Sequence, residues 1–230
     1  KRSAIVRLHK DDKGSWQISQ LPEVESAFVA VDPKNGAIRA LVGGFDFNRN
    51  KFNHVTQAWR QPGSSFKPFI YSAALEKGYG PNSVIADEPI VIPASQTGTA
   101  AWEPHNYDGK YEGPMKMRTA LAKSKNMVSI RILQSIGTRY AQDYAARFGF
   151  DAAKHPPYLT MALGAGSVTS WQMVSAYAVF ANGGYKVSPF VVREIRDGAN
   201  QVLAQSAQIE AGEESTRVID PRNAFMMDAM

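Results

Sequence analysis

Ser64 and Lys67 form the only Ser-x-x-Lys pattern in the chain, and together they could activate a hydroxyl for nucleophilic attack. Residues three apart lie on the same face of a helix, so Lys67 can lie against Ser64. A lysine whose pKa is lowered by burial can then accept the hydroxyl proton. The preceding Gln61-Pro62-Gly63 predicts a tight turn that exposes Ser64 at a helix N-terminus, where the dipole favours negative charge. A simple cap, with Ser64 or Ser65 as the N-cap and Lys67 in solvent, is the alternative.

Ser124-Lys125-Asn126 is the only Ser-x-Asn pattern, and it begins 60 residues after Ser64, between two segments of helical periodicity. In an extended connection, alternation directs Ser124 and Asn126 to one side and Lys125 outward. A hydroxyl and an amide on one side suit proton relay and the binding of a peptide carbonyl. The alternative is a capping pair, in which Ser124 or Asn126 ends one helix and begins the next.

The elements that must position these motifs are predicted from hydrophobic periodicity. Apolar residues at helical spacing predict a helix over 66–77, with Pro68 in its first turn and Gly78 as its C-terminal cap. Further helices are expected at about 115–123, 126–136, 138–148 and 170–182, and from Pro221 onward. Residues 79–114, rich in Pro, Gly and Asn, are expected to form a long structured loop.

Three hairpins are predicted from short apolar runs that flank turn residues. They are expected within 1–22, at 27–32 with 37–42, and at 189–196 with 201–205. Because both runs of the second hairpin are strongly apolar, we expect it to be covered on both faces. Strand pairs that flank a mostly helical middle indicate an α+β fold.

The composition is that of an ordinary globular chain, with 230 residues of which 44% are hydrophobic and 20% charged. The net charge of +5 is mild, and no run of basic residues predicts a nucleic-acid partner. The absence of cysteine excludes disulfides and thiolate catalysis, and the four histidines lack metal-ligand spacing. We therefore expect no metal and no cofactor. No stretch approaches the roughly 18–20 apolar residues needed to span a bilayer, so any membrane anchor is expected outside this chain.

Together the two motifs resemble the active-serine signature of penicillin-binding proteins and serine β-lactamases. The segments around them are similar to those of class A, bifunctional penicillin-binding proteins, from about Glu25 to the end. This similarity is carried by residues 60–68, 102–111, 113–114, 120–126, 162–166 and 181–185. It implies a penicillin-binding/β-lactamase-like transpeptidase fold, an antiparallel sheet with a helical subdomain. Residues 23–230 are then expected to be a transpeptidase domain that lacks its C-terminal part, and 1–22 the end of a β-rich linker or accessory module.

The resemblance implies a peptidoglycan D,D-transpeptidase. Ser64 is expected to attack the carbonyl between the two terminal D-alanines of a cell-wall stem peptide, with Lys67 as its base. Ser124 is expected to relay the proton to the departing D-alanine, and Asn126 to hold the substrate amide and help position Lys67. The Ser64 backbone N–H would be one oxyanion donor. An amine of a neighbouring stem peptide then takes the acyl group, and β-lactams trap the serine as an ester.

Ser65, Trp102 and Tyr107 are further candidate substrate contacts. Trp102 and Tyr107 precede the second motif and fit the border of a substrate groove. Packed loop anchors would show the same residue types, so this alternative stays open.

The third motif of the family, Lys-Thr-Gly, is absent from the chain. Gln96-Thr97-Gly98-Thr99 lacks the lysine and precedes the second motif, whereas the family places the third motif after it. We therefore expect a truncated or cleaved domain, with a companion fragment that carries Lys-Thr-Gly, a wall of the cleft and half of the oxyanion hole. The full-length protein is expected to have a membrane anchor and a glycosyltransferase domain, in the bacterial cell envelope at the outer, periplasmic face of the cytoplasmic membrane.

Two other functions remain compatible with the sequence. One is a non-catalytic, penicillin-recognising sensor or scaffold that keeps the fold without turnover. The other is a D,D-carboxypeptidase or a β-lactamase. Class A β-lactamases use a glutamate to activate the deacylating water, but no Glu-x-x-x-Asn pattern follows Asn126. A long-lived acyl-enzyme is therefore expected.

Overall fold

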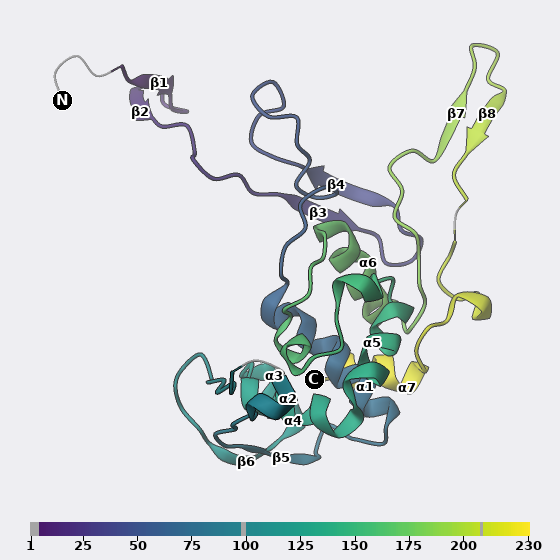
Figure 1. Cartoon of the computed structure of the whole chain (residues 1–230). Coiled ribbons are helices and arrows are strands. Elements are labelled where there is room, and N and C mark those ends of the chain that lie inside the picture. The colour runs from purple at the N-terminus through teal and green to yellow at the C-terminus, as the bar shows by residue number, and fades with distance from the viewer. Residues whose placement is uncertain (1–4, 98–99, 208) are drawn as a thin grey trace.

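The computed structural model describes residues 5–97, 100–207 and 209–230, which form a helical body and, among these residues, four two-stranded antiparallel sheets (Figure 1). The hydrophobic core lies among helices α1 (Lys67–Glu76), α4 (Asn126–Ile136), α5 (Thr138–Arg147), α6 (Ser170–Ala181) and α7 (Pro221–Asp228). Helix α1 contacts α4, α5 and α7. Lys67 of the first motif therefore begins the helix that lies at the centre of the core.

Helix α1 is buried almost all the way round. Every residue from Phe69 to Leu75 is buried. The ring of Phe69 lies 5.0 Å from Phe148, 4.8 Å from Phe150 and 5.4 Å from Phe180, centroid to centroid. Such aromatic pairs add about 0.5–1.5 kcal/mol each to the burial of their surface. The predicted helix is confirmed, and Gly78, at φ +91°, follows its end as expected.

The remaining predicted helices are also confirmed, as α3 (Met117–Ala122), α4, α5, α6 and α7. A capping box fixes the start of α6, where the Thr169 side chain and Gln172 exchange hydrogen bonds. The Asp220 side chain caps α7. The described part of the chain also contains four short 3₁₀ helices, each too short to show a sequence period that would predict it: η1 (Gly63–Phe66), η2 (Ala152–Lys154), η3 (Leu159–Leu163) and η4 (Glu214–Thr216).

Two of the predicted hairpins are confirmed and extend away from the helices (Figure 1). The first pairs β1 (Arg7–Lys10) with β2 (Trp16–Ser19), and the other pairs β7 (Glu194–Arg196) with β8 (Val202–Gln205). Nearly all of their side chains are exposed. The assignment of residues 1–22 to a separate module stays a prediction.

The hairpin of β3 (Phe28–Val31) and β4 (Ile38–Val42) is present, but the prediction that it is covered on both faces is wrong. Helix α6 packs against β3. Phe28 and Val42 are nevertheless 59% and 53% exposed. An apolar run shows that a strand can be buried, whereas actual burial needs a partner layer, and among the described residues this sheet has one on a single side.

The segment 79–114, predicted to be a long structured loop, is not a loop throughout. It contains β5 (Val84–Asp87) and the short helix α2 (Ala94–Thr97), and β6 (Gly113–Lys116) begins at its end. Strands β5 and β6 pair antiparallel, with Asp87 opposite Gly113. A four-residue strand that starts with Gly-Pro carries little local signal, so its distant partner decides the structure. The Gln96–Thr99 segment, excluded above as a third motif, lies partly outside the described residues.

Membrane-spanning elements were sought among the described residues, and none of their helices is both long and apolar enough to cross a bilayer.

Candidate active site

Ser64 lies in η1, on a turn that is held by a close backbone contact. Gly63 has φ +58°, and its N–H donates to the Gly164 carbonyl at 3.3 Å. A Cβ on Gly164 would stand 2.1 Å from the Gly63 carbonyl oxygen, so only glycine lets the end of η3 approach this turn so closely. Phe66 anchors the turn in the core while Ser64 stays exposed. The predicted exposure of Ser64 at the entry to α1 is therefore confirmed.

Lys67 is the first residue of α1, and its side chain is 1% exposed. Its Nζ donates to the Ser124 carbonyl at 2.6 Å, to Ser124 Oγ at 3.0 Å and to Asn126 Oδ1 at 2.7 Å. The structure thus brings the two sequence motifs into direct contact. Within the described residues, none of the hydrogen bonds of Lys67 goes to Ser64.

The environment of Lys67 lowers its basicity. Burial disfavours the ammonium form and lowers the pKa of Lys67 from 10.5 to about 8. All three acceptors around Nζ are neutral oxygens, which satisfy the three donors of an ammonium without adding an opposite charge. A pKa of about 8 leaves a useful neutral fraction near neutral pH, and this is the property that a general base needs.

Ser124 and Asn126 occupy the connection between α3 and α4. Ser124 adopts φ +53°, a left-handed conformation that costs a non-glycine residue roughly 1–2 kcal/mol. Its N–H donates to the Leu121 carbonyl at 2.9 Å, and the Lys125 N–H donates to the Ala120 carbonyl at 2.9 Å. Asn126 begins α4, and its Nδ2 donates to the His105 carbonyl at 2.8 Å. Both side chains of the pair meet Lys67, and the family resemblance implied this contact for Asn126.

The prediction for Lys125 is wrong, because its side chain is 2% exposed instead of pointing outward to solvent. Its Nζ lies 3.0 Å from Glu112 Oε1, 3.1 Å from Asp108 Oδ2 and 3.4 Å from Asp87 Oδ2. Burial by itself would lower the pKa of Lys125, but the three carboxylates together raise it above its usual range. The left-handed Ser124 breaks the alternation assumed for an extended connection, and the carboxylates supply the charge that burial requires.

A small open pocket of about 280 Å³ brings Ser64 of the first motif together with the second motif. It is lined by Ser64, Asn106, Tyr107, Asp108, Lys123, Ser124, Lys125 and Asn126. Tyr107 is fully exposed on its rim, so it is available to a ligand instead of anchoring the loop.

Two of the candidate substrate contacts lie elsewhere. Ser65 lines a larger, separate pocket of about 770 Å³, and its carbonyl accepts a hydrogen bond from the Tyr177 hydroxyl at 2.8 Å. The backbone of Trp102 pairs with Ile92, and its side chain packs on the core beside a third pocket. Neither residue lines the pocket of Ser64.

Sequence reasoning missed the residues that support the second motif. Asn106 is buried between this motif and Asp87, which is itself fully buried. The only sequence signal was the position of Asn106 within the segment 102–111, four residues after Trp102. Groups of three or more histidine, cysteine or acidic residues able to hold a metal ion are not found in the described part of the chain.

The chain is similar to known proteins of one family. A family model described as penicillin binding protein transpeptidase domain matches residues 26–230. Penicillin-binding protein 1A of Neisseria lactamica is 49% identical over 227 residues, which make up 99% of this chain and 28% of that protein. The chain thus spans little more than a quarter of the length of this relative.

Two solved structures are also similar to the chain. The crystal structure of penicillin-binding protein 1A from Haemophilus influenzae matches with a TM-score of 0.89 and 38% identity, over 96% of this chain and 36% of that one. The PonA1 protein from Mycobacterium tuberculosis, in complex with penicillin V, matches with a TM-score of 0.74 and 27% identity. That match covers 90% of this chain and 56% of PonA1.

Proposed function

This chain belongs to the family of penicillin-binding protein transpeptidase domains, and from that premise we propose that it carries out acyl transfer through Ser64. The proposed activity is that of a serine-type D,D-transpeptidase, which cross-links the stem peptides of peptidoglycan. The observation that carries the proposal is the contact of Lys67 with Ser124 and Asn126. A buried amine of lowered basicity, three residues after an exposed serine and hydrogen-bonded to a second hydroxyl, is an arrangement that suits serine acyl transfer.

In the proposed acylation step, neutral Lys67 accepts the proton of Ser64 Oγ as that oxygen bonds to the carbonyl carbon of the penultimate D-alanine. The peptide bond to the terminal D-alanine then breaks. Ser124 Oγ, 3.0 Å from Lys67 Nζ, donates its proton to the leaving nitrogen and regains one from Lys67. The two motifs thereby move one proton from the nucleophile to the leaving group.

In the second step, an amine of a neighbouring stem peptide attacks the Ser64 ester, which forms the cross-link and frees the serine. A β-lactam would follow the first step only, because its leaving nitrogen stays tethered to the acyl group in the pocket. The complex of PonA1 with penicillin V supports this part of the proposal, since that protein is similar to the chain over most of its length.

Intact-mass spectrometry of the full-length protein after incubation with a penicillin tests the nucleophile. We expect one stoichiometric adduct that persists for hours and is lost in Ser64→Ala. Ser215→Ala, on the exposed turn η4, is the matched control and should keep the adduct. Absence of any adduct on the folded wild-type protein would refute the proposal and leave the sensor or scaffold.

Product analysis separates the remaining enzymatic alternatives. With a stem peptide and an acceptor amine, a transpeptidase forms the new amide, whereas a D,D-carboxypeptidase releases only the shortened peptide. A β-lactamase would lose the penicillin adduct within the assay and release hydrolysed drug. A cross-linked product that depends on Ser64 would support the proposal over both.

The rest of the protein is proposed on the same basis. The chain covers 28% of penicillin-binding protein 1A from Neisseria lactamica, which leaves room for further domains. We infer that the full-length protein supplies the Lys-Thr-Gly strand, a glycosyltransferase domain and a membrane anchor. It would then act in the bacterial cell envelope, at the periplasmic face of the cytoplasmic membrane.

A further inference from the structure

Lys125 lies between the two reactive residues of the second motif, yet it takes no part in the proposed chemistry. Its buried ammonium is surrounded by the carboxylates of Asp87, Asp108 and Glu112, and it also donates to the Lys110 carbonyl at 3.2 Å. These partners come from the segment 87–112, which precedes the motif in the chain. Lys125 therefore ties that segment to the α3–α4 connection by charge.

Asn106 ties the same two segments together by hydrogen bonds. Its Oδ1 accepts from the N–H groups of Asn126 at 2.8 Å and Met127 at 3.3 Å, which are free donors in the first turn of α4. Its Nδ2 donates to Asp87 Oδ1 at 2.6 Å and to the Lys110 carbonyl at 2.7 Å. Asn106 thus acts as the cap of α4, because the N-cap residue, Lys125, makes no side-chain hydrogen bond to the N–H groups of the first turn.

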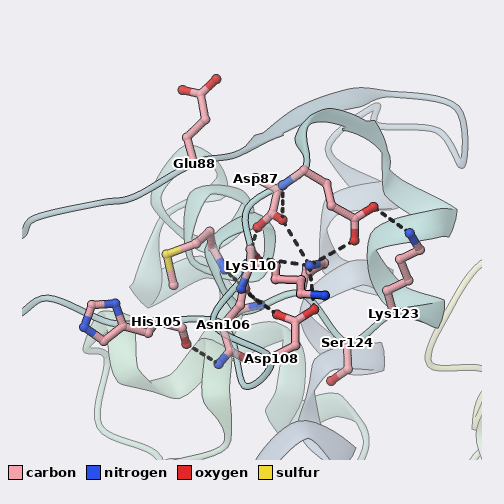
Figure 2. Close-up of polar contacts among 12 residues, drawn as sticks. Asp87, Glu88, His105, Asn106, Asp108, Lys110, Lys123 and Ser124 are labelled. Carbon is pink, nitrogen blue, oxygen red and sulfur yellow. Dashed lines mark hydrogen bonds and ion pairs between the residues drawn. The ribbon is translucent and has the colours of Figure 1, made fainter.

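Asp87 joins the two sets of contacts. It is fully buried at the end of β5, and its Oδ2 also accepts from the Glu112 N–H at 3.0 Å. Figure 2 shows Asp87, Asn106 and Asp108 grouped around Lys110, with Lys123 and Ser124 to their right. We refer to Asp87, Asn106 and Lys125 as the support cluster.

Asn106 and Lys125 of the support cluster line the pocket of Ser64. Among the described residues, the hydrogen bonds of Lys67 go to Ser124 and Asn126 and not to the cluster. What it holds is the backbone from which Ser124 and Asn126 reach the Lys67 amine. Ser124 is in a left-handed conformation, and such strain persists only where the surrounding structure fixes it. The cluster supplies that restraint, since it binds the residue after Ser124 and the N–H group of Asn126.

We propose that Asn106, Asp87 and Lys125 are positioning residues for the acyl transfer at Ser64. They fix the α3–α4 connection so that Ser124 and Asn126 stay within hydrogen-bonding distance of the general base. They also hold the segment 106–108 against the pocket, where it forms one wall. The inference rests on the proposed function, because it assigns roles in that reaction.

The test measures the second-order rate constant of acylation by a fluorescent penicillin, on full-length protein, across the pH range. Asn106→Ala and Lys125→Met should each lower the rate constant about ten- to hundredfold, as expected for misplaced catalytic groups. The midpoint of the pH profile should also move upward from about 8, because a loosened connection lets water reach Lys67. A role in stability alone would not move this midpoint.

Asn223→Ala is the matched control. Asn223 is 3% exposed and bonds the Ser72 carbonyl at 2.9 Å and the Tyr144 hydroxyl at 3.1 Å, in the core between α1, α5 and α7. Its loss should reduce stability as Asn106→Ala does, while the acylation rate of the folded protein changes less than about twofold. If the control slows acylation as much as the cluster variants, the effect is general destabilisation and the inference is overturned.

A milder variant covers the case in which the buried substitutions prevent folding. Asp108→Asn with Glu112→Gln removes the two half-exposed partners of Lys125 and leaves Asp87 in place. It should fold and slow acylation two- to tenfold, with an upward shift of the midpoint. Wild-type rates and midpoint in every folded variant would overturn the positioning role. No adduct on the wild-type protein would instead defeat the proposed function itself.

Discussion

Asn126→Asp would place a carboxylate where a neutral amide oxygen now accepts from Lys67 Nζ at 2.7 Å. The change is nearly isosteric, so the main perturbation is one negative charge beside the buried amine. An opposite charge within about 4–6 Å typically favours the charged form by about 1–3 pKa units. The pKa of Lys67, held at about 8 by burial, should therefore rise to between about 9 and 11.

The expected loss of activity follows from the neutral fraction of the base. With a pKa of about 8, about 10% of Lys67 is neutral at pH 7. With a pKa between about 9 and 11, that fraction falls to between about 1% and 0.01%. If neutral Lys67 is the base, the acylation rate constant at pH 7 should fall between about tenfold and a thousandfold.

The assay is the acylation rate constant with a fluorescent penicillin from pH 6 to 10, corrected for spontaneous hydrolysis of the drug. The wild-type rate should rise about fivefold from pH 7 to 8 and less than about twofold from pH 8 to 9. The Asn126→Asp rate should instead rise between about fivefold and tenfold from pH 8 to 9, where the wild-type rate is already levelling off. Asn126→Ala removes the amide without adding charge, so it should slow acylation while its midpoint stays near that of the wild type.

Two results would refute this reasoning. A reduction by the same factor at every pH in Asn126→Asp would mean that Asn126 acts on the substrate and not on Lys67. A wild-type rate that rises about tenfold per unit up to pH 10 would mean that Lys67 keeps the pKa of an ordinary lysine, near 10.5.

Further predictions concern stability. Between pH 8 and 10.5 the free energy of unfolding of the wild type should rise by up to roughly 3 kcal/mol relative to that of Lys67→Met, because the unfolded lysine binds a proton that folded Lys67 has released. Denaturant titrations measure this, and the same pH dependence in both proteins would contradict it. His155 is buried against Phe66 without a hydrogen bond to either ring nitrogen among the described residues, and burial lowers its pKa. Stability should therefore fall as pH drops below 6.5, and His155→Leu should reduce the fall of the melting temperature between pH 7 and 5. The same pH dependence of the melting temperature in the variant and the wild type would argue against it. Gly164→Ala should destabilise the fold by more than about 2 kcal/mol, because the added Cβ would stand 2.1 Å from backbone. The Cβ of Gly78→Ala meets nothing within 4 Å, so that variant should lose only about 1 kcal/mol. Equal losses of the two variants in thermal unfolding would refute the steric argument.

The helices were predictable because their signals are local. The apolar residues of 66–77 and 126–136 recur at helical spacing, and Gly78 and Gly137 follow the helix ends. The first motif was found for the same reason, since Ser64 and Lys67 lie three residues apart where η1 leads into α1. Their meeting with Ser124 and Asn126, however, depended on the family resemblance and not on the spacing.

The errors all concern contacts between distant segments. The pairing of β5 with β6 joins residues 84–87 to 113–116. The sequence of a four-residue strand contains no signal that identifies a partner so distant in the chain. The burial of Lys125 depends on Asp87, which lies 38 residues earlier in the chain. A lysine is nearly always exposed unless it is paired, and the sequence gives no sign of which carboxylate will pair with it.

The two buried lysines show how environment divides roles between identical side chains. Lys67 and Lys125 are both almost inaccessible to water. Lys67 meets only neutral oxygens, so burial prevails and its pKa falls to about 8, within reach of a base at physiological pH. Lys125 meets three carboxylates, so its pKa rises and it stays an ammonium that can hold segments together but cannot take a proton. In the proposed mechanism, Asn126 therefore leaves Lys67 able to accept a proton, because its amide carries no negative charge. The test with Asn126→Asp would remove that distinction between the two lysines.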